Sequence, residues 1–332
     1  MTINNFSTYQ YVDLSENDIL ICALGYECRS YYLLEKNLAT RNGSNTLIIN
    51  FDDLEKKYLS NSLTCKIDAL KLKTEICSYA QGEKFQNDVI SFLNEVVRSE
   101  TKRKIYIDYS SMPRNWYCAL PEKIENEIQN RCLDLIFLYV AGTYPEKYES
   151  YPTAGIARLK LFSGGALPRI DSQRSHLIAL SYDTRRTQSL LSMLEPEFLI
   201  VCYAYDTLEK KVEIEEVNQD IIRRASASVA LPINDFVYIL QKMNEIIIEQ
   251  TREGQIIIIP DGPKPLIFAM SLSSILADID DDITCLHINR NELLADNKVK
   301  VLARKNEIYG VKISINNIGT ESCLLKRSFA FT

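Results

Sequence analysis

The sequence contains one pattern twice, and this repeat limits the folds that the chain can adopt. When the 332 residues are shifted by 150 positions without a gap, the segment NEVV at 94–97 aligns with NEII at 244–247. Because internal repetition indicates copies of one structural unit, we expect two related domains, at residues 1–168 and 169–332. The same shift also aligns a proline and a cation in each half: Pro113 with Pro263, and Arg114 with Lys264.

The repeat is also present nearer the start of each half, where the offset becomes about 156 positions, as loop insertions would produce. DILICALGYECRS at 18–30 matches SHLIALSYDTRR at 175–186. Each half therefore carries a tyrosine, an acid and an arginine directly after its first apolar run. The matching residues are Tyr26, Glu27 and Arg29 in half one and Tyr182, Asp183 and Arg185 in half two.

Short apolar runs alternate with longer amphipathic segments in each half. Continuous apolar runs of strand length are typical of parallel strands that are buried on both faces. Strands that alternate with helices predict an α/β fold. We therefore expect two tandem, internally duplicated Rossmann-like domains with mostly parallel sheets. The runs of half one lie at 19–24, 47–51, 104–109 and 133–140.

The spacing of apolar residues predicts helices over 83–97 and 232–248. Pro232 is expected in the first turn of the second of these helices, a position that tolerates the missing N–H group of proline. Apolar and polar residues alternate at 155–162 and 298–315. We expect these two segments to add antiparallel edge strands or a hairpin.

Composition excludes several classes of protein. With 38 basic and 44 acidic residues the formal charge is -6, whereas coating a nucleic acid needs a basic surplus to neutralise phosphates. The nine cysteines form no C-x-x-C pair and there are two histidines. We therefore expect no disulfide framework, no metal site and no Ser-His-Asp triad. Neither G-x-G-x-x-G nor G-x-x-x-x-G-K-[ST] is present, so no cofactor is expected.

The sequence also predicts a protein that does not enter a membrane. No apolar run reaches the length needed to cross a bilayer, and the start MTINNFSTYQ lacks the order of regions found in a signal peptide. We therefore expect a cytoplasmic protein.

Candidate binding residues follow from the predicted sheets. In an open parallel sheet, ligands bind beyond the carboxyl ends of the strands, near the point where the strand order reverses. The loop after the first run carries Glu27 and Arg29 in half one and Asp183 and Arg185 in half two. An acid there can cap a helix, and an arginine can bind phosphate or carboxylate. The neighbouring tyrosines are candidates to contact a sugar or a base.

A second loop follows the third apolar run, with the sequence DYSSMPRN at 108–115 and PDGPKP at 260–265. Small or polar residues, a proline and then a cation that opens a helix can hold an anion, because helix N–H groups point outward there. The candidate ligand-binding residues of the two loops are Tyr26, Arg29, Ser110, Ser111, Arg114, Tyr182, Arg185, Gly262 and Lys264.

The same residues have structural interpretations. The prolines and serines can begin and cap helices, and the cations can be solvated. The acid and the arginine of each first loop can form an ion pair that fixes the loop. Trp116, the one tryptophan, is expected to pack in a core or against the other half.

The segment IIIIPDGPKPLIFAMSL at 256–272, within a duplicated chain, resembles the Rossmann-like sensor domains called CARF and their fused relatives, the SAVED domains. In those families a strand ends in a turn of the form T-G-G-T-K-x-M and leads into a helix. Gly262 and Lys264 match the glycine and the lysine, whereas half one lacks the glycines. Residues of half one that correspond through the repeat are Ser110, Ser111 and Arg114.

This resemblance implies binding of a cyclic or linear oligonucleotide messenger across a pseudo-dimeric cleft, in prokaryotic antiviral defence. The families usually attach an effector such as a nuclease or a protease. No segment of that length remains beside two sensor-sized halves, so the resemblance implies a separate effector protein, or a half that has itself become catalytic.

Three functions fit the sequence. The first is a sensor or regulatory subunit in which the cations neutralise the phosphates of a nucleotide-type ligand, and binding shifts how the halves or neighbouring subunits are arranged. The second is an enzyme that cleaves or modifies a nucleotide, with Glu27 or Asp183 as general base. The third is an architectural subunit whose degenerate pockets bind nothing. Each is compatible with an oligomer, and none predicts a membrane partner.

Overall fold

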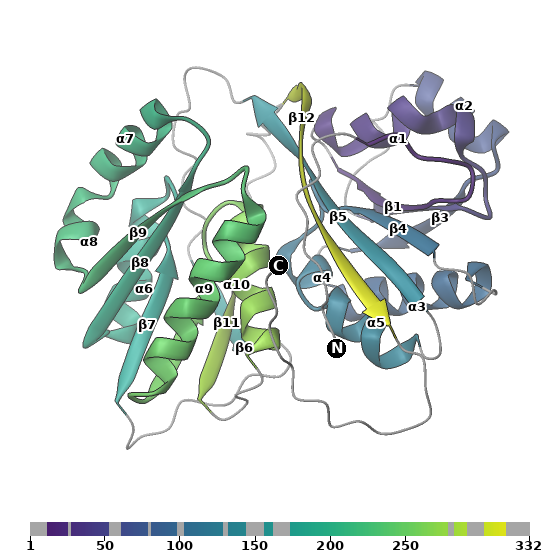
Figure 1. Cartoon of the computed structure of the whole chain (residues 1–332). Helices are drawn as coiled ribbons and strands as arrows, with labels where there is room; N and C mark the ends of the chain where they lie inside the picture. The colour runs from purple at the N-terminus through teal and green to yellow at the C-terminus, as the bar shows by residue number, and fades with distance from the viewer. Residues whose placement is uncertain are drawn as a thin grey trace. The chain divides into compact units, whose positions relative to one another are not determined.

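The computed structural model describes residues 12–25, 28–52, 61–78, 81–97, 103–128, 132–143, 156–161, 173–277, 282–290 and 302–316. Two six-stranded sheets organise these residues (Figure 1). The first sheet contains β1 (Ile19–Leu24), β2 (Thr46–Phe51), β3 (Lys73–Cys77), β4 (Arg103–Asp108), β5 (Cys132–Thr143) and β12 (Leu302–Asn316). Their order across the sheet is β12-β5-β4-β1-β2-β3.

The second sheet repeats this topology. Its order is β6-β11-β10-β7-β8-β9, which becomes the order of the first sheet when β7 is matched to β1. All neighbouring strands are parallel except for β12 against β5 and β6 against β11. The expected α/β fold with duplicated, mostly parallel, Rossmann-like sheets is therefore confirmed. These strands are β6 (Ile156–Leu161), β7 (Arg174–Ala179), β8 (Phe198–Tyr205), β9 (Ala227–Pro232), β10 (Gln255–Ile259) and β11 (Ile283–Arg290).

The last strand of each half pairs with the sheet of the other half. β6, which follows the first five strands, runs antiparallel to β11, and β12, at the end of the second half, runs antiparallel to β5. The two compact units are consequently 1–146 with 298–332, and 147–297. The repeat in the sequence divides the chain near residue 168, whereas strand pairing groups each terminal strand with the opposite half.

Helices cover both faces of the first sheet (Figure 1). On one face, Leu33 and Leu34 of α1 and Leu63 of α2 pack against Leu20 and Cys22 of β1. On the other face, α3 buries an apolar stripe at helical spacing. The predicted helix at 83–97 is therefore confirmed to within a residue. The helices of this unit are α1 (Tyr32–Asn37), α2 (Asn61–Ala69), α3 (Gly82–Val96), α4 (Arg114–Tyr117) and α5 (Leu120–Glu127), with short 3-10 turns at Cys28–Tyr31 and Leu38–Thr40.

The second sheet has a core of the same kind. Leu190, Ile214 and Ile221, from three different helices, pack against Ile178 of β7 and Val201 of β8. Among the described residues, no helix is both long and apolar enough to cross a membrane. The helices are α6 (Thr184–Leu194), α7 (Leu208–Val217), α8 (Gln219–Arg224), α9 (Phe236–Thr251) and α10 (Lys264–Leu276).

One helix boundary differs from the prediction. Pro232 does not lie in the first turn of a helix, because it ends β9, and α9 begins four residues later at Phe236. The side chain of Asp235 accepts a hydrogen bond of 3.0 Å from the N–H group of Tyr238 and so caps the helix. The acid supplies a capping acceptor that proline lacks, so the helix starts after the acid.

His176 in β7 makes stability dependent on pH. Its side chain is buried, and burial, together with the positive charge of Arg174, lowers its pKa to about 4. The unfolded chain binds a proton near pH 6.5 while the folded chain does not. The stability that comes from this difference in pKa is therefore fully present above pH 6.5. It is lost as the pH falls toward 4, because protonation then favours the unfolded chain.

We expect the free energy of unfolding to fall by about 3 kcal/mol between pH 7 and pH 4 through this histidine. Urea unfolding of the wild type and of the His176→Gln variant across this range measures the effect. The variant should lose less stability on acidification, because glutamine does not titrate. Equal losses in the two proteins would contradict the assignment.

Candidate functional site

The two predicted loops lie side by side in each unit, where the strand order reverses. β1 neighbours β4, and β7 neighbours β10. A Cβ atom added to Gly25, at the end of β1, would lie 2.9 Å from the Cβ atom of Ser111. A Cβ atom added to Gly262 would lie 3.2 Å from that of Ala179 and 3.3 Å from the carbonyl oxygen of Leu180. These contacts leave little room for a side chain, so glycine permits the close approach of the loops.

In the first unit, two candidate residues are buried in hydrogen-bonded contacts. Arg29 is 3% exposed and donates a hydrogen bond of 2.7 Å to the hydroxyl of Tyr139, whose ring its guanidinium also faces. The hydroxyl of Ser110 accepts a bond of 2.8 Å from the N–H group of Val140 and donates to Asp108. These side chains link the carboxyl ends of β1, β4 and β5 and are directed into the protein.

The remaining candidates of the first unit are partly exposed or lie outside the described residues. The hydroxyl of Ser111 donates to the carbonyl oxygen of Ala23. Arg114 is half-buried and is the first residue of α4, a helix of one turn. Tyr26 and Glu27 lie outside the part of the chain that the structure describes.

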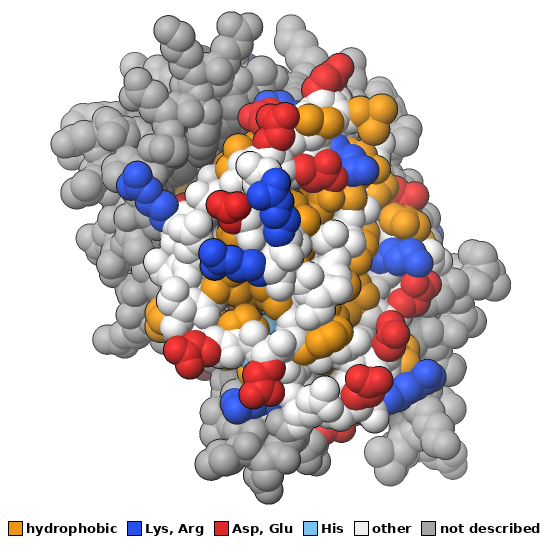
Figure 2. Space-filling model, turned by 90° about the vertical axis from the view of Figure 1, so that its left-hand side faces the viewer, with side chains coloured by type: hydrophobic (Ala, Val, Ile, Leu, Met, Phe, Trp, Pro, Cys, Tyr) orange, Lys and Arg blue, Asp and Glu red, His pale blue; other side chains and the backbone are white. Residues whose placement is uncertain are grey.

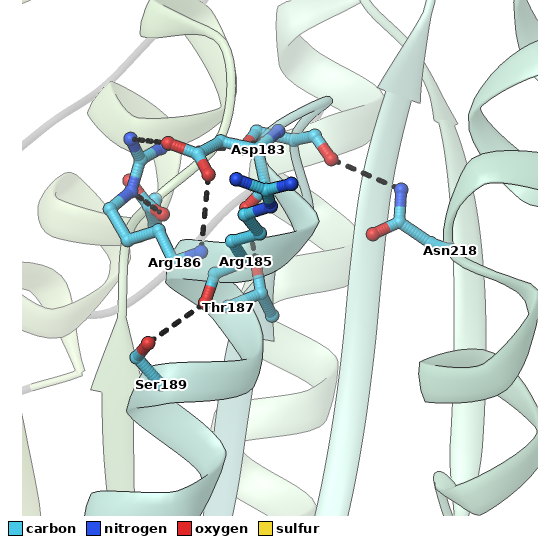
Figure 3. Close-up of polar contacts among 8 residues, drawn as sticks. Asp183, Arg185, Arg186, Thr187, Ser189 and Asn218 are labelled. Carbon is cyan, nitrogen blue, oxygen red and sulfur yellow. Dashed lines mark hydrogen bonds and ion pairs between the residues drawn. The ribbon is translucent and has the colours of Figure 1, made fainter. Parts of the chain in front are cut away.

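In the second unit, Asp183 is the N-cap of α6. Its Oδ1 accepts a hydrogen bond of 3.1 Å from the N–H group of Arg186, and its Oδ2 lies 2.7 Å from the Arg186 guanidinium (Figure 3). The Nε of Arg186 lies 2.6 Å from Asp261, a carboxylate with no exposed surface. One buried arginine therefore joins the loop after β7 to the loop after β10 through two charge-assisted hydrogen bonds.

Arg186 was not among the residues singled out from the sequence, and Asp183 forms its ion pair with Arg186 and not, as one structural interpretation had it, with Arg185. The acid pairs with Arg186 because an N-cap and the residue three positions later lie on one face of a helix, whereas a residue two positions later does not. The sequence D-T-R-R at 183–186 carries this signal. Arg185 instead projects to solvent, and its guanidinium makes no ion pair with another described residue.

The start of α10 completes the edge of the second sheet. Pro263 is its N-cap, with no side chain to accept from the helix N–H groups, and Lys264 is its first residue. Lys264 is half-buried. A helix N-terminus carries a partial positive charge, so this end of the sheet combines a helix dipole with the charges of Lys264 and Arg185.

Tyr182 lies at the same edge and is 41% exposed. Partial burial, with the negative charges of Glu213 and Asp206, raises the pKa of its hydroxyl to about 12. The ring is therefore neutral at physiological pH and presents an exposed aromatic surface beside the arginine loop.

Asn218 is a further residue that the sequence did not reveal. It is 1% exposed, and its Nδ2 donates bonds of 3.0 Å to the carbonyl oxygens of Ser181 and Ile214 (Figure 3). Its Oδ1 is buried without a hydrogen-bond partner among the described residues. The asparagine ties the end of α7 to the loop that holds Tyr182 and Asp183, and so it orders that loop.

Comparison with known proteins adds no family. No protein-family model matches the chain, and no curated protein matches it. Among the described residues, no group of three or more His, Cys, Asp or Glu side chains is placed to hold a metal ion.

Proposed function

We propose that the protein is a sensor or regulatory subunit that binds a phosphorylated, nucleotide-type ligand at the carboxyl edge of the second sheet. The observation that carries the proposal is the joining of two loops by Arg186, beside an exposed Arg185 and the α10 N-terminus. Arg186 pairs with Asp183 and Asp261, and Arg185 and Lys264 add positive charge beside the amino end of α10. The helix dipole at this end favours an anion.

The arrangement supports a preformed binding edge. Arg185 is exposed and Lys264 is the first residue of α10, so these two cations would contact phosphate. Tyr182 would stack on a base or a sugar, since its exposed ring lies in the same loop as Arg185. The overall charge of -6 argues against binding to long nucleic acids, yet a local cationic edge is sufficient for a small ligand.

The enzyme hypothesis receives less support. Both carboxylate oxygens of Asp183 are engaged, one by a backbone N–H group and the other by the Arg186 guanidinium. A carboxylate held in this way serves as a helix cap more readily than as a general base. The resemblance to CARF and SAVED domains suggests instead that the bound ligand would act through a separate effector protein in antiviral defence.

Thermal unfolding in the presence of nucleotides tests the proposal. The panel contains nucleoside mono-, di- and triphosphates, together with linear and cyclic oligonucleotides. A ligand present at 100 times its Kd stabilises the folded state by about 2.7 kcal/mol. We expect at least one member to stabilise the wild type, and Arg185→Ala and Lys264→Ala each to raise its Kd by about tenfold or more.

The matched control is Arg223→Ala. Arg223 is an exposed arginine in α8, which leads into the amino end of β9, so it lies at the opposite edge of the same sheet. This variant should bind like the wild type. If no panel member stabilises the protein, or if all three variants respond equally, the proposed site is wrong.

A further inference from the structure

The edge of the second sheet at β9 is open along its first four residues. Among the described residues, β8 is the one strand that pairs with β9, and Ala227 and Ser228 are exposed while Val229 and Ala230 are half-buried. The N–H group of Ile233, just after the strand, bonds to the Tyr205 carbonyl of β8 at 2.8 Å, in the register that pairs Ala227 with Ile200. Since successive residues of a strand direct their N–H and C=O groups to opposite sides, those of Ser228 and Ala230 point away from β8.

The sequence along this edge carries no charge, and its one proline, Pro232, comes after the four open residues. From Ala225 to Asn234 (ASASVALPIN) there is no charged residue. Proteins normally protect exposed strand edges with charges, bulges or covering segments, because an open edge is a template for another strand. Figure 2 shows a face of the molecule on which charged side chains are separated from one another by uncharged ones.

The corresponding edge of the first sheet, β3, is protected. It carries Lys73 and Glu75, and Lys73 forms an ion pair with Glu95 of α3. The Nζ of Lys84 also donates a bond of 2.8 Å to the carbonyl oxygen of Ile76. The carbonyl oxygen of Cys77 accepts a hydrogen bond from the N–H group of Asp52, just after the end of β2. Successive residues of a strand direct their C=O groups to opposite sides, so the carbonyl group of Ile76 faces away from β2. One edge of the duplicated fold is therefore covered by charges while its counterpart is left open.

The charges at the two ends of β9 favour a second copy of this chain as the partner. Arg223 and Arg224 are exposed just before the strand, and Asp235 is exposed just after it. In an antiparallel pair related by a two-fold axis, the basic end of one strand meets the acidic end of the other, twice. A parallel pair would bring like charges together. Antiparallel pairing is also the arrangement that a closed, symmetric dimer requires.

We propose that two copies of the chain associate through β9, which joins their second sheets into one continuous sheet. With Ser228 on the two-fold axis, Ser228 exchanges both of its backbone hydrogen bonds with Ser228 of the partner subunit. The side chain of Ser228 then lies opposite that of Ser228 of the partner subunit. This surface is separate from the proposed ligand site, which lies at the carboxyl ends of the strands.

Sedimentation equilibrium of the full chain from about 1 to about 100 µM tests the proposal. We expect a reversible dimer, and Ser228→Lys should raise its dissociation constant by about tenfold or more because two like charges meet on the axis. Mixing Ser228→Lys with Ser228→Asp should restore a heterodimer. The matched control is Thr74→Lys, at an exposed position of β3, which should leave association unchanged.

Each alternative result overturns the proposal. If the wild type stays monomeric over the whole concentration range, β9 does not pair with a second copy of the chain. A peptide strand from another protein would then be the candidate partner of this edge. A Ser228→Lys variant that dimerises like the wild type would place the interface elsewhere. Circular dichroism of each variant checks that the fold is retained, so that loss of the dimer cannot be attributed to unfolding.

Discussion

Replacing Arg186 with leucine is expected to lower the free energy of unfolding by about 3–5 kcal/mol. The guanidinium lies 2.6 Å from Asp261, which has no exposed surface, and 2.7 Å from Asp183. Removing the arginine leaves a carboxylate charge inside the protein, where water cannot solvate it. Urea unfolding followed by circular dichroism measures the loss.

Two further variants make this test specific. Arg185→Leu changes the neighbouring arginine, which is exposed, and should alter stability by less than about 0.5 kcal/mol. Adding Asp261→Asn to Arg186→Leu removes the buried charge and should recover part of the lost stability. Equal effects of the two arginine substitutions, or no recovery in the double variant, would show that the Asp261 pair does not hold the loops together.

Replacing Trp116 with alanine is expected to cost about 3–5 kcal/mol of stability. The indole has no exposed surface and stacks between Phe51 of β2 and Phe85 of α3, with ring centroids 5.0 and 4.6 Å away. Alanine would remove both aromatic contacts and leave a cavity. Urea unfolding must be followed by circular dichroism, because the chain has no other tryptophan to report by fluorescence.

Trp116→Phe is the matched control for this prediction. Phenylalanine keeps a stacked ring and removes the indole N–H group, which is buried without a hydrogen-bond partner among the described residues. We expect it to cost clearly less than alanine, about 1–2 kcal/mol. Similar losses for the two variants would indicate that the stack contributes little. The buried position also excludes Trp116 as a surface on which a ligand base could stack.

The sequence predicted the α/β class and the central, mostly parallel strands because these depend on local patterns. Continuous apolar runs indicate buried parallel strands, and the repeat indicates two sheets of equal order. The edge strands β3 and β9 were missed. Both strands contain charged or small residues: the sequence of β3 is Lys-Thr-Glu-Ile-Cys and that of β9 is Ala-Ser-Val-Ala-Leu-Pro. A strand that is paired on one side needs no continuous apolar run, so these segments lack the pattern of a buried strand.

The exchange of β6 and β12 between the halves was not predictable from the pattern either. Alternating residues indicated two edge strands, but each could pair with either sheet. In the candidate site, the position of both loops followed from topology alone. The hydrogen-bond partners of the individual side chains did not follow from topology. Arg29 and Arg186 both lie in first loops, yet they bond to residues far away in the sequence, Tyr139 and Asp261 respectively.

Native mass spectrometry of the protein isolated from its own host tests the central claim most directly, because it needs no prior choice of ligand. We expect wild-type protein to carry an added mass that matches a phosphorylated compound. The double variant Arg185→Ala, Lys264→Ala, expressed in the same way and shown to be folded, should carry none. A wild type with no added mass, or a double variant that retains the same compound, would contradict a phosphate site at the carboxyl edge of the second sheet.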